Sequence, residues 1–194
     1  MTRLLLTLLL ALPLWMQAQD TTVTDMNYWL VRTGTEFNHP GNLRSIPADA
    51  NDFIPHHVAF ENARQDYEVR YFFVPLDSTS TYYNRQKALD PLAELADPNE
   101  YCQMAMELAV QHASKNKVHN FQIMERNSLK SIYRADWGAT QQVDLVNEEI
   151  PFQFCQVICL HKNDLADVYI YYLTNDKNQL MEVMADMLPV FRFL

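Results

Sequence analysis

Three cysteines and six histidines are the residues of this chain best suited to act as nucleophiles or metal ligands. Cys159 and His161 are two residues apart, so on an extended strand they would share one face, as a thiol and its base must. The surrounding sequence predicts a buried core strand, which a substrate would not reach. We therefore assign no catalytic residue.

The cysteine spacing limits which disulfides can form. Cys155 and Cys159 lie four residues apart on one predicted strand, so their Cα atoms are about 13 Å apart. This is beyond the roughly 7 Å that a disulfide spans. Cys102 could pair with either of them, and an exported protein would permit such a bridge. We favour the alternative, three buried thiols that pack as small apolar side chains.

The remaining titratable residues predict no metal or cofactor site. His56 and His57 are neighbours, and neighbouring side chains on a strand point to opposite faces, whereas metal ligands must converge. No two histidines have the spacing of one helical turn. The acidic pairs Asp164 with Asp167 and Glu148 with Glu149 fall in predicted turns, and we interpret them as solvated charges.

Glycine is scarce, at three residues in 194. Dinucleotide fingerprints, phosphate-binding loops and the nucleophile elbow of serine hydrolases all need closely spaced glycines. Gly34, Gly41 and Gly138 are too far apart to form any of these motifs.

The first 18 residues have the pattern of a signal peptide. Arg3 precedes an apolar run from Leu4 to Trp15, and Met16 to Ala18 form a plausible cleavage triplet. The sequence thus predicts export to the periplasm or the medium, with no membrane span. The formal net charge of -9 argues against nucleic acid as a partner.

One polar and aromatic group is a candidate for binding a partner. Tyr133, Arg134, Asp136 and Trp137 follow one another closely, and aromatic residues with arginine are typical of interface hot spots. The alternative is structural: Trp137 would be a core residue on a bent strand, with Arg134 and Asp136 paired on the solvent side.

Several segments have clear local signals. Asp25 or Thr24 could begin a short helix that ends at Gly34. Residues 57–62 and 67–74 predict a β-hairpin, and Asp97 with Pro98 predicts the start of a helix that carries Cys102 and Met106.

Other segments predict irregular structure. Residues 35–55 contain three prolines and indicate a long surface loop, and residues 77–84 indicate a Ser/Thr/Tyr-rich loop, followed by a helical turn or two around Pro91. Residues 132–146 predict a strand, in which Gly138 indicates a bulge or a close backbone approach.

The last quarter of the chain has the strongest pattern. Residues 152–161 alternate so that Ile158 and Leu160 share one face while Cys155 and Cys159 share the other. Residues 166–174 are apolar on both faces and predict a strand inside the sheet. Asp176 is the expected cap of a final amphipathic helix.

This order of elements resembles the PsbP-like superfamily, which includes Mog and DcrB-like proteins. The likeness is carried by residues 135–139, by the strands at 152–161 and 166–174, and by the helix from Asp176 to the aromatic end of the chain. It implies an α+β fold with an antiparallel β-sheet flanked by helices, an α/β/α sandwich, over residues 53–194. Residues 19–52 would form an N-terminal short helix and loop.

Members of the superfamily mostly act as accessory or binding proteins, so the resemblance implies a non-enzymatic exported domain that binds a protein partner. The second hypothesis is a small-ligand carrier with an aromatic pocket between sheet and helices, lined by residues such as Tyr71, Tyr169 and Tyr171. A secreted hydrolase is the third. A cavity of hundreds of Å³ would favour the carrier, and a filled interior with an exposed aromatic patch would favour partner binding.

Overall fold

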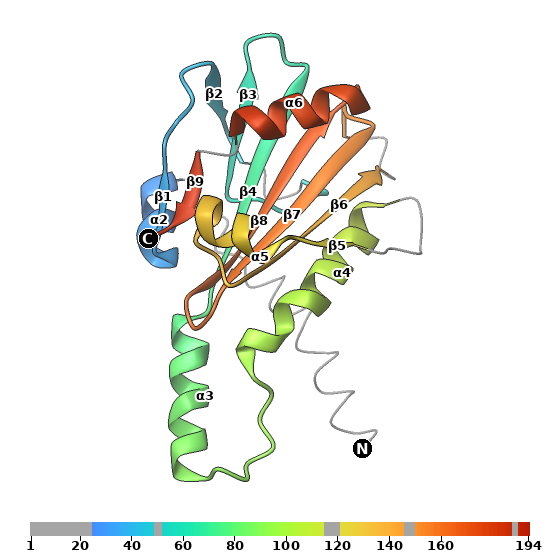
Figure 1. Ribbon diagram of the computed structural model, residues 1–194. Helices are drawn as coiled ribbons and strands as arrows, with labels where there is room; N and C mark the ends of the chain where they lie inside the picture. Colours follow the sequence, from blue (N-terminus) through green and yellow to red (C-terminus); the bar gives the residue numbers. More distant parts are fainter. Residues whose placement is uncertain (1–24, 49–51, 115–120, 146–149, 188–189) are drawn as a thin grey trace.

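A seven-stranded antiparallel sheet forms the centre of the molecule (Figure 1). The computed structural model describes residues 25–48, 52–114, 121–145, 150–187 and 190–194. The strand order is β2-β3-β4-β8-β7-β6-β5. These strands are β2 (Leu43–Ile46), β3 (Val58–Asn62), β4 (Tyr67–Pro75), β5 (Gln122–Ile123), β6 (Trp137–Asp144), β7 (Phe154–Lys162) and β8 (Ala166–Thr174).

Helices pack on both faces of the sheet, which confirms the predicted α+β fold. One face is covered by helix α2 (Met26–Thr33), a short turn α5 (Arg126–Ser128), the π-helical turn η2 (Leu129–Tyr133) and helix α6 (Lys177–Met187). The other face is covered by helix α4 (Tyr101–Ala113), which follows a 3-10 turn, η1 (Pro98–Glu100). Helix α3 (Asp77–Leu89) projects beyond the end of the sheet (Figure 1).

Strand β8 is the central strand, between β4 and β7, and all nine of its residues are buried. Its hairpin with β7 has continuous one-to-one pairing from Lys162 with Ala166 to Phe154 with Thr174. The predicted hairpin, its two faces and the inside position of the second strand are therefore confirmed.

The two faces of the sheet have separate cores. We call one of them the closed face; it carries Tyr71 and Phe73 of β4, Ile158 of β7, and Ile170 and Tyr172 of β8. Its aromatic side chains pack on a second, two-stranded sheet formed by β1 (Thr35–Phe37) and β9 (Phe191–Phe193). We call the other one the α4 face; its sheet residues are Phe72, Cys155, Val157, Tyr169 and Tyr171.

Helix α2 has both predicted end signals. The Asp25 carboxylate accepts a hydrogen bond of 2.9 Å from the Asn27 N–H, and Gly34 ends the helix in the left-handed region at φ 57°. Trp29 of this helix is buried in the core of the closed face. The N-terminal helix thus packs on the core of the closed face.

The loop prediction for residues 35–55 was wrong in part, because strands β1 and β2 lie within it. These strands pair with partners distant in sequence: Thr35 pairs with Phe193, and Leu43 pairs with Asn62. Strands of three or four residues are too short to show a period of two, so no local pattern predicts them.

The loop prediction for residues 77–84 was also wrong, since α3 occupies this segment and extends to Leu89. Asp77 in its first turn forms an ion pair of 3.1 Å with Arg32 of α2, and an acidic residue there complements the helix dipole. The helical turn expected around Pro91 is absent from the described structure, where the chain forms a turn after α3. Pro91 follows the helix end, as is common.

The strand predicted for residues 132–146 begins later than expected. Ile132 and Tyr133 belong to η2, and Arg134 ends that turn with φ 54°. β6 pairs with β7 without a bulge, from Trp137 with His161 onward. Gly138 instead allows a close approach, because an added Cβ would lie 2.6 Å from Leu129 Cδ2.

The C-terminal helix α6 is capped as predicted. The Asp176 carboxylate accepts a hydrogen bond of 2.9 Å from the Asn178 N–H, and Leu180, Val183 and Met187 are buried on the closed face. The predicted signal peptide, and Leu188 and Pro189 at the expected helix end, lie outside the described residues. Within the described part of the chain, no helix has the length and hydropathy needed to cross a membrane.

Candidate functional site

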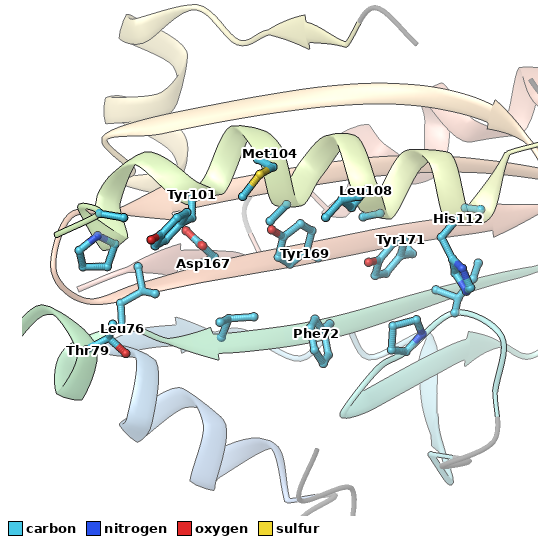
Figure 2. Close-up of a pocket in the computed structure, with 18 of the residues that line it drawn as sticks. Phe72, Leu76, Thr79, Tyr101, Met104, Leu108, His112, Asp167, Tyr169 and Tyr171 are labelled. Carbon is cyan, nitrogen blue, oxygen red and sulfur yellow. The ribbon is translucent and has the colours of Figure 1, made fainter. Parts of the chain in front are cut away.

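A cavity of about 380 Å³ lies between helix α4 and the α4 face of the sheet. We call it the α4 pocket. Its floor is formed by alternate residues of two neighbouring strands, because side chains two apart on a strand share a face. Figure 2 shows Asp167, Tyr169 and Tyr171 in a row beneath the helix, with Phe72 on the neighbouring strand. The floor residues are Phe72 and Val74 of β4 and Asp167, Tyr169 and Tyr171 of β8.

Helix α4 forms the opposite wall. Met106 and Val110 are fully buried and anchor it to the sheet. The small side chains of Ala105 and Ala109 face the pocket and leave space that larger residues would fill. Other lining residues of the helix are Tyr101, Met104, Leu108, His112 and Ala113.

The start of α4 is fixed by a local signal in the sequence. The Asp97 carboxylate accepts a hydrogen bond of 2.9 Å from the Asn99 N–H, and Pro98 occupies the first position of η1. This end of the pocket is completed by α3 and the segment between the helices. Those lining residues are Leu76, Thr79, Tyr82, Tyr83, Leu95, Ala96 and Pro98.

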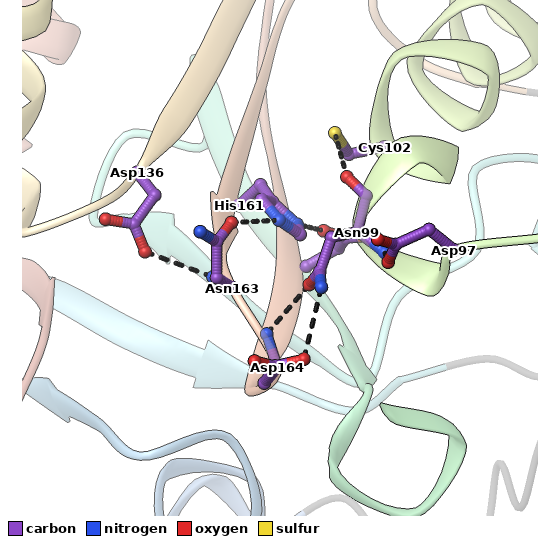
Figure 3. A network of polar contacts seen from close by, with 8 residues as sticks. Asp97, Asn99, Cys102, Asp136, His161, Asn163 and Asp164 are labelled. Atoms are coloured by element: carbon purple, nitrogen blue, oxygen red, sulfur yellow. Dashed lines mark hydrogen bonds and ion pairs between the residues drawn. The ribbon is translucent and has the colours of Figure 1, made fainter. Parts of the chain in front are cut away.

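Asp167 places a carboxyl group in this mainly apolar lining. Asp167 is 4% exposed, and its Oδ1 lies 2.6 Å from Nδ1 of His161 on the neighbouring strand. Nε2 of His161 lies 3.0 Å from Oδ1 of Asn163 (Figure 3). Both ring nitrogens of His161 therefore face oxygen atoms, an arrangement that favours the imidazolium ion.

The two partners have shifted pKa values. Burial alone would lower the pKa of His161, but the hydrogen bond and charge of Asp167, with a contribution from Asn163, raise it. Burial raises the pKa of Asp167, and the hydrogen bond and charge of His161 offset part of this rise. Asp167 and His161 thus form a buried ion pair in which each charge depends on the other.

Polar contacts on both sides hold this pair in place (Figure 3). A carboxylate oxygen of Asp136 accepts a hydrogen bond of 3.1 Å from the Asn163 N–H. On the other side, the Asn99 side chain donates to Asp164 Oδ1 at 3.1 Å and accepts from the Asp164 N–H at 2.8 Å. Hydrogen bonds therefore connect the turn between β7 and β8 to the residue before β6 and to η1.

Two tyrosines on β8 add hydroxyl groups to the pocket lining, Tyr169 and Tyr171. The Tyr169 hydroxyl lies near the Cys159 thiol, a weak hydrogen-bonding group. It has no hydrogen bond that meets normal geometry within the described residues. Burial, followed by the nearby charges, raises the pKa of both tyrosines, so both hydroxyls stay protonated.

A second buried charge cluster lies beside Tyr171 in the sheet. Arg70 is the cross-strand neighbour of Tyr171. Its guanidinium lies 3.0 Å from Glu68 and 2.7 Å from Asp52. Because all three charges are paired, we interpret this cluster as structural.

The predicted partner-binding residues have different environments. Tyr133 is buried in the core of the closed face, and burial raises its pKa to about 12. Arg134 is exposed, and Trp137 is partly buried in edge-to-face contact with Phe121. Our structural alternative paired Asp136 with Arg134, and this part of it was wrong. Asp136 forms ion pairs with Lys130 and Lys162.

The three cysteines are free and buried in the structure. Burial, with the charge of Asp167, raises the pKa of the Cys102 thiol to about 12, and burial raises the pKa of Cys155 and Cys159 as well. A protonated, buried thiol is a poor nucleophile. Among the described residues, no three histidine, cysteine or acidic side chains lie close enough to hold a metal ion.

His56 and His57 are both buried and make structural contacts. His56 Nδ1 lies 2.9 Å from the Ile54 carbonyl oxygen. His57 Nδ1 accepts a hydrogen bond of 3.1 Å from the Phe73 N–H, and the ring stacks on Trp29 at 3.7 Å. Burial and the nearby charge of His56 lower the pKa of His57 to about 4.

Sequence reasoning found part of the pocket. It named Tyr169 and Tyr171, which do line it, but Tyr71 was wrong. Tyr71 pairs with Ile170 across the sheet and therefore lies on the closed face. Asp167 was missed, because we interpreted it as a solvated turn charge. Its spacing of two from Tyr169 on one strand was the available signal.

Comparisons with known proteins give little further information. No protein-family model and no curated protein match this chain. A structure search finds similarity to the solution structure of cyanobacterial PsbP (CyanoP) from Synechocystis sp. PCC 6803, with a TM-score of 0.46 and 13% sequence identity. The match covers 88% of this chain and 89% of that chain. At this TM-score the likeness does not bear on function, and membership of the PsbP-like superfamily stays a prediction.

Proposed function

We propose that this chain is a non-enzymatic binding domain that holds a small apolar molecule in the α4 pocket. The observation that carries the proposal is the cavity of about 380 Å³. Ligand sites in proteins typically have volumes of about 300 to 1,000 Å³ and mostly apolar linings with a few polar groups. The α4 pocket has both properties.

The composition of the lining supports a carrier more than an enzyme. Its polar side chains include two tyrosines of β8 whose raised pKa values keep them neutral, and Asp167, which is paired with His161. The nearest thiols are protonated. His112, the histidine of the lining, has its Nε2 3.0 Å from the Phe53 carbonyl oxygen and its ring stacked on the Phe53 ring, so we assign it a structural role. Acid–base or nucleophilic catalysis needs a group that changes its protonation state within reach of the substrate, and the described lining supports binding instead.

Binding can be tested with N-phenyl-1-naphthylamine, an uncharged dye whose fluorescence rises in apolar surroundings. We expect saturable binding to the wild-type protein. Ala109→Leu should weaken it by about tenfold or more, because the added side chain occupies the cavity. Gln103→Leu adds the same side chain to an exposed position of the same helix and should leave binding unchanged. Equal binding by all three proteins would place the dye elsewhere and contradict the proposal.

Partner binding through Tyr133, Arg134, Asp136 and Trp137 remains a separate hypothesis. Arg134 is exposed, and Asp136 and Trp137 are partly exposed, so these three side chains are able to contact a partner. Tyr133 would act only by supporting them from the core. Export by a signal peptide, to the periplasm or the medium, is proposed on the sequence pattern of residues 1–18 alone.

A further inference from the structure

The carboxyl group of Asp167 is an unusual feature of the α4 pocket. The residue is 4% exposed and lies among apolar and aromatic side chains. A buried carboxyl group costs free energy unless hydrogen bonds or an opposite charge compensate it. Its position in the lining of a cavity therefore needs a physical reason.

The contacts of Asp167 satisfy only one of its two carboxyl oxygens. Oδ1 faces His161 Nδ1 at 2.6 Å. Within the described residues, Oδ2 forms no hydrogen bond. A carboxylate can accept about four hydrogen bonds, so Asp167 retains acceptor capacity at the pocket.

Asp167 lies at one end of the α4 pocket. Figure 2 shows Asp167 beside Tyr101, near Leu76 and Thr79, whereas His112 lies at the other end of α4. Between them the helix contributes apolar side chains such as Met104 and Leu108. The pocket thus has a polar end and a long apolar part.

We propose that the ligand of the α4 pocket carries an uncharged hydrogen-bond donor, a hydroxyl or N–H group, at one end, and that Asp167 accepts this hydrogen bond. The proposal rests on the proposed binding function and adds the chemistry of the ligand. His161 acts as a positioning residue, because its ring holds Oδ1 and leaves Oδ2 for the ligand.

The charges around Asp167 exclude other ligand classes. A carboxylate ligand, such as a fatty acid, would place a second negative charge beside Asp167 in apolar surroundings, where like charges repel strongly. A cationic ligand gains little, since the imidazolium of His161 already compensates the carboxylate. A neutral donor satisfies Oδ2 without adding a charge.

The test compares ligands of one shape that differ in a single group. 2-Naphthol has a donor, 2-methylnaphthalene has a methyl group in its place, and 2-naphthoate has a carboxylate. Each displaces N-phenyl-1-naphthylamine in a titration with the full chain. Wild-type protein should bind 2-naphthol about tenfold or more tightly than 2-methylnaphthalene, as expected for a hydrogen bond to a charged group. 2-Naphthoate should bind least tightly.

Two variants identify the residue that recognises the donor. Asp167→Asn keeps the shape and an acceptor for His161, and it should reduce the preference for 2-naphthol to about threefold or less while 2-methylnaphthalene binds as before. Tyr169→Phe removes the neighbouring hydroxyl and should retain the preference. Loss of the preference in Tyr169→Phe alone would assign recognition to Tyr169 and overturn the proposal.

The outcomes separate this proposal from the function on which it rests. If no naphthalene derivative displaces the dye from a folded protein, the binding function is wrong. If 2-methylnaphthalene and 2-naphthol bind wild-type protein equally, or if 2-naphthoate binds most tightly, the pocket binds apolar molecules but the role of Asp167 is wrong. Binding of the three naphthalene derivatives to the wild-type protein tests the role of Asp167 even if Asp167→Asn does not fold.

Discussion

The two faces of the sheet are built from the same strands but differ in how they are filled. On the closed face, Tyr71, Phe73 and Phe191 pack against one another, with ring centroids about 6 Å apart. On the α4 face, a single helix with alanines toward the sheet leaves a cavity of about 380 Å³. One face is therefore filled by side chains, whereas the other retains a cavity.

The buried charges follow the same division. The α4 face carries the Asp167–His161 pair and the cluster of Glu68, Arg70 and Asp52. The core of the closed face includes the tyrosines Tyr71, Tyr133 and Tyr172. Ionic groups at a buried face are costly unless paired, and the charges of both groups are paired.

The largest expected effect is a loss of stability on the closed face. Phe191→Ala removes a ring that is 1% exposed and contacts Tyr71 and Phe73, so the free energy of unfolding should fall by about 3 to 5 kcal/mol. Leu108→Ala at the α4 pocket removes a side chain that is 39% exposed and should cost about 1 kcal/mol or less. Urea unfolding of both variants measures the difference. Equal losses would mean that the α4 face is packed as tightly as the closed face.

The two buried histidines should respond to pH in opposite directions. The pKa of His57, lowered to about 4, means that the unfolded chain binds a proton more readily. The stability contributed by neutral His57 is present above pH 6.5 and is lost as the pH falls toward 4, by up to about 3 kcal/mol. The raised pKa of His161 means that its contribution is present below pH 6.5 and is lost as the pH rises through the folded value.

Urea unfolding between pH 4 and pH 8 measures how the stability changes with pH and checks both directions. His57→Gln should show a smaller loss of stability below pH 6.5 than the wild type, since a glutamine can still accept the Phe73 N–H. His161→Gln should show a smaller loss above pH 6.5. Unchanged pH profiles in both variants would show that neither histidine is perturbed by burial.

The smallest effect on stability is expected at Trp137, at the edge of the α4 face. This side chain is partly buried and contacts Phe121. If it binds a protein partner, Trp137→Ala should reduce capture of that partner from a periplasmic extract and leave the melting temperature nearly unchanged. Tyr28→Ala, at an exposed aromatic residue of α2 that does not line the α4 pocket, is the matched control. A large fall in melting temperature would instead make Trp137 a core residue.

Features that depend on neighbouring residues were predictable from the amino-acid sequence. The alternation in residues 154–162 and 166–174 predicted the central hairpin, because each strand residue faces a side set by its own position. Asp25, Asp97 and Asp176 predicted three helix starts, since a capping side chain bonds the backbone two residues further on.

Only the tertiary structure decided the features that depend on distant partners. The register of β4 on β8 placed Tyr71 opposite Ile170 and so on the closed face. The pairing of β7 with β8 brought Asp167 opposite His161 and buried an acid that its own turn appeared to leave in solvent. The α4 pocket forms where residues of β4, β8, α3 and α4 meet, and no local pattern shows that these elements lie together.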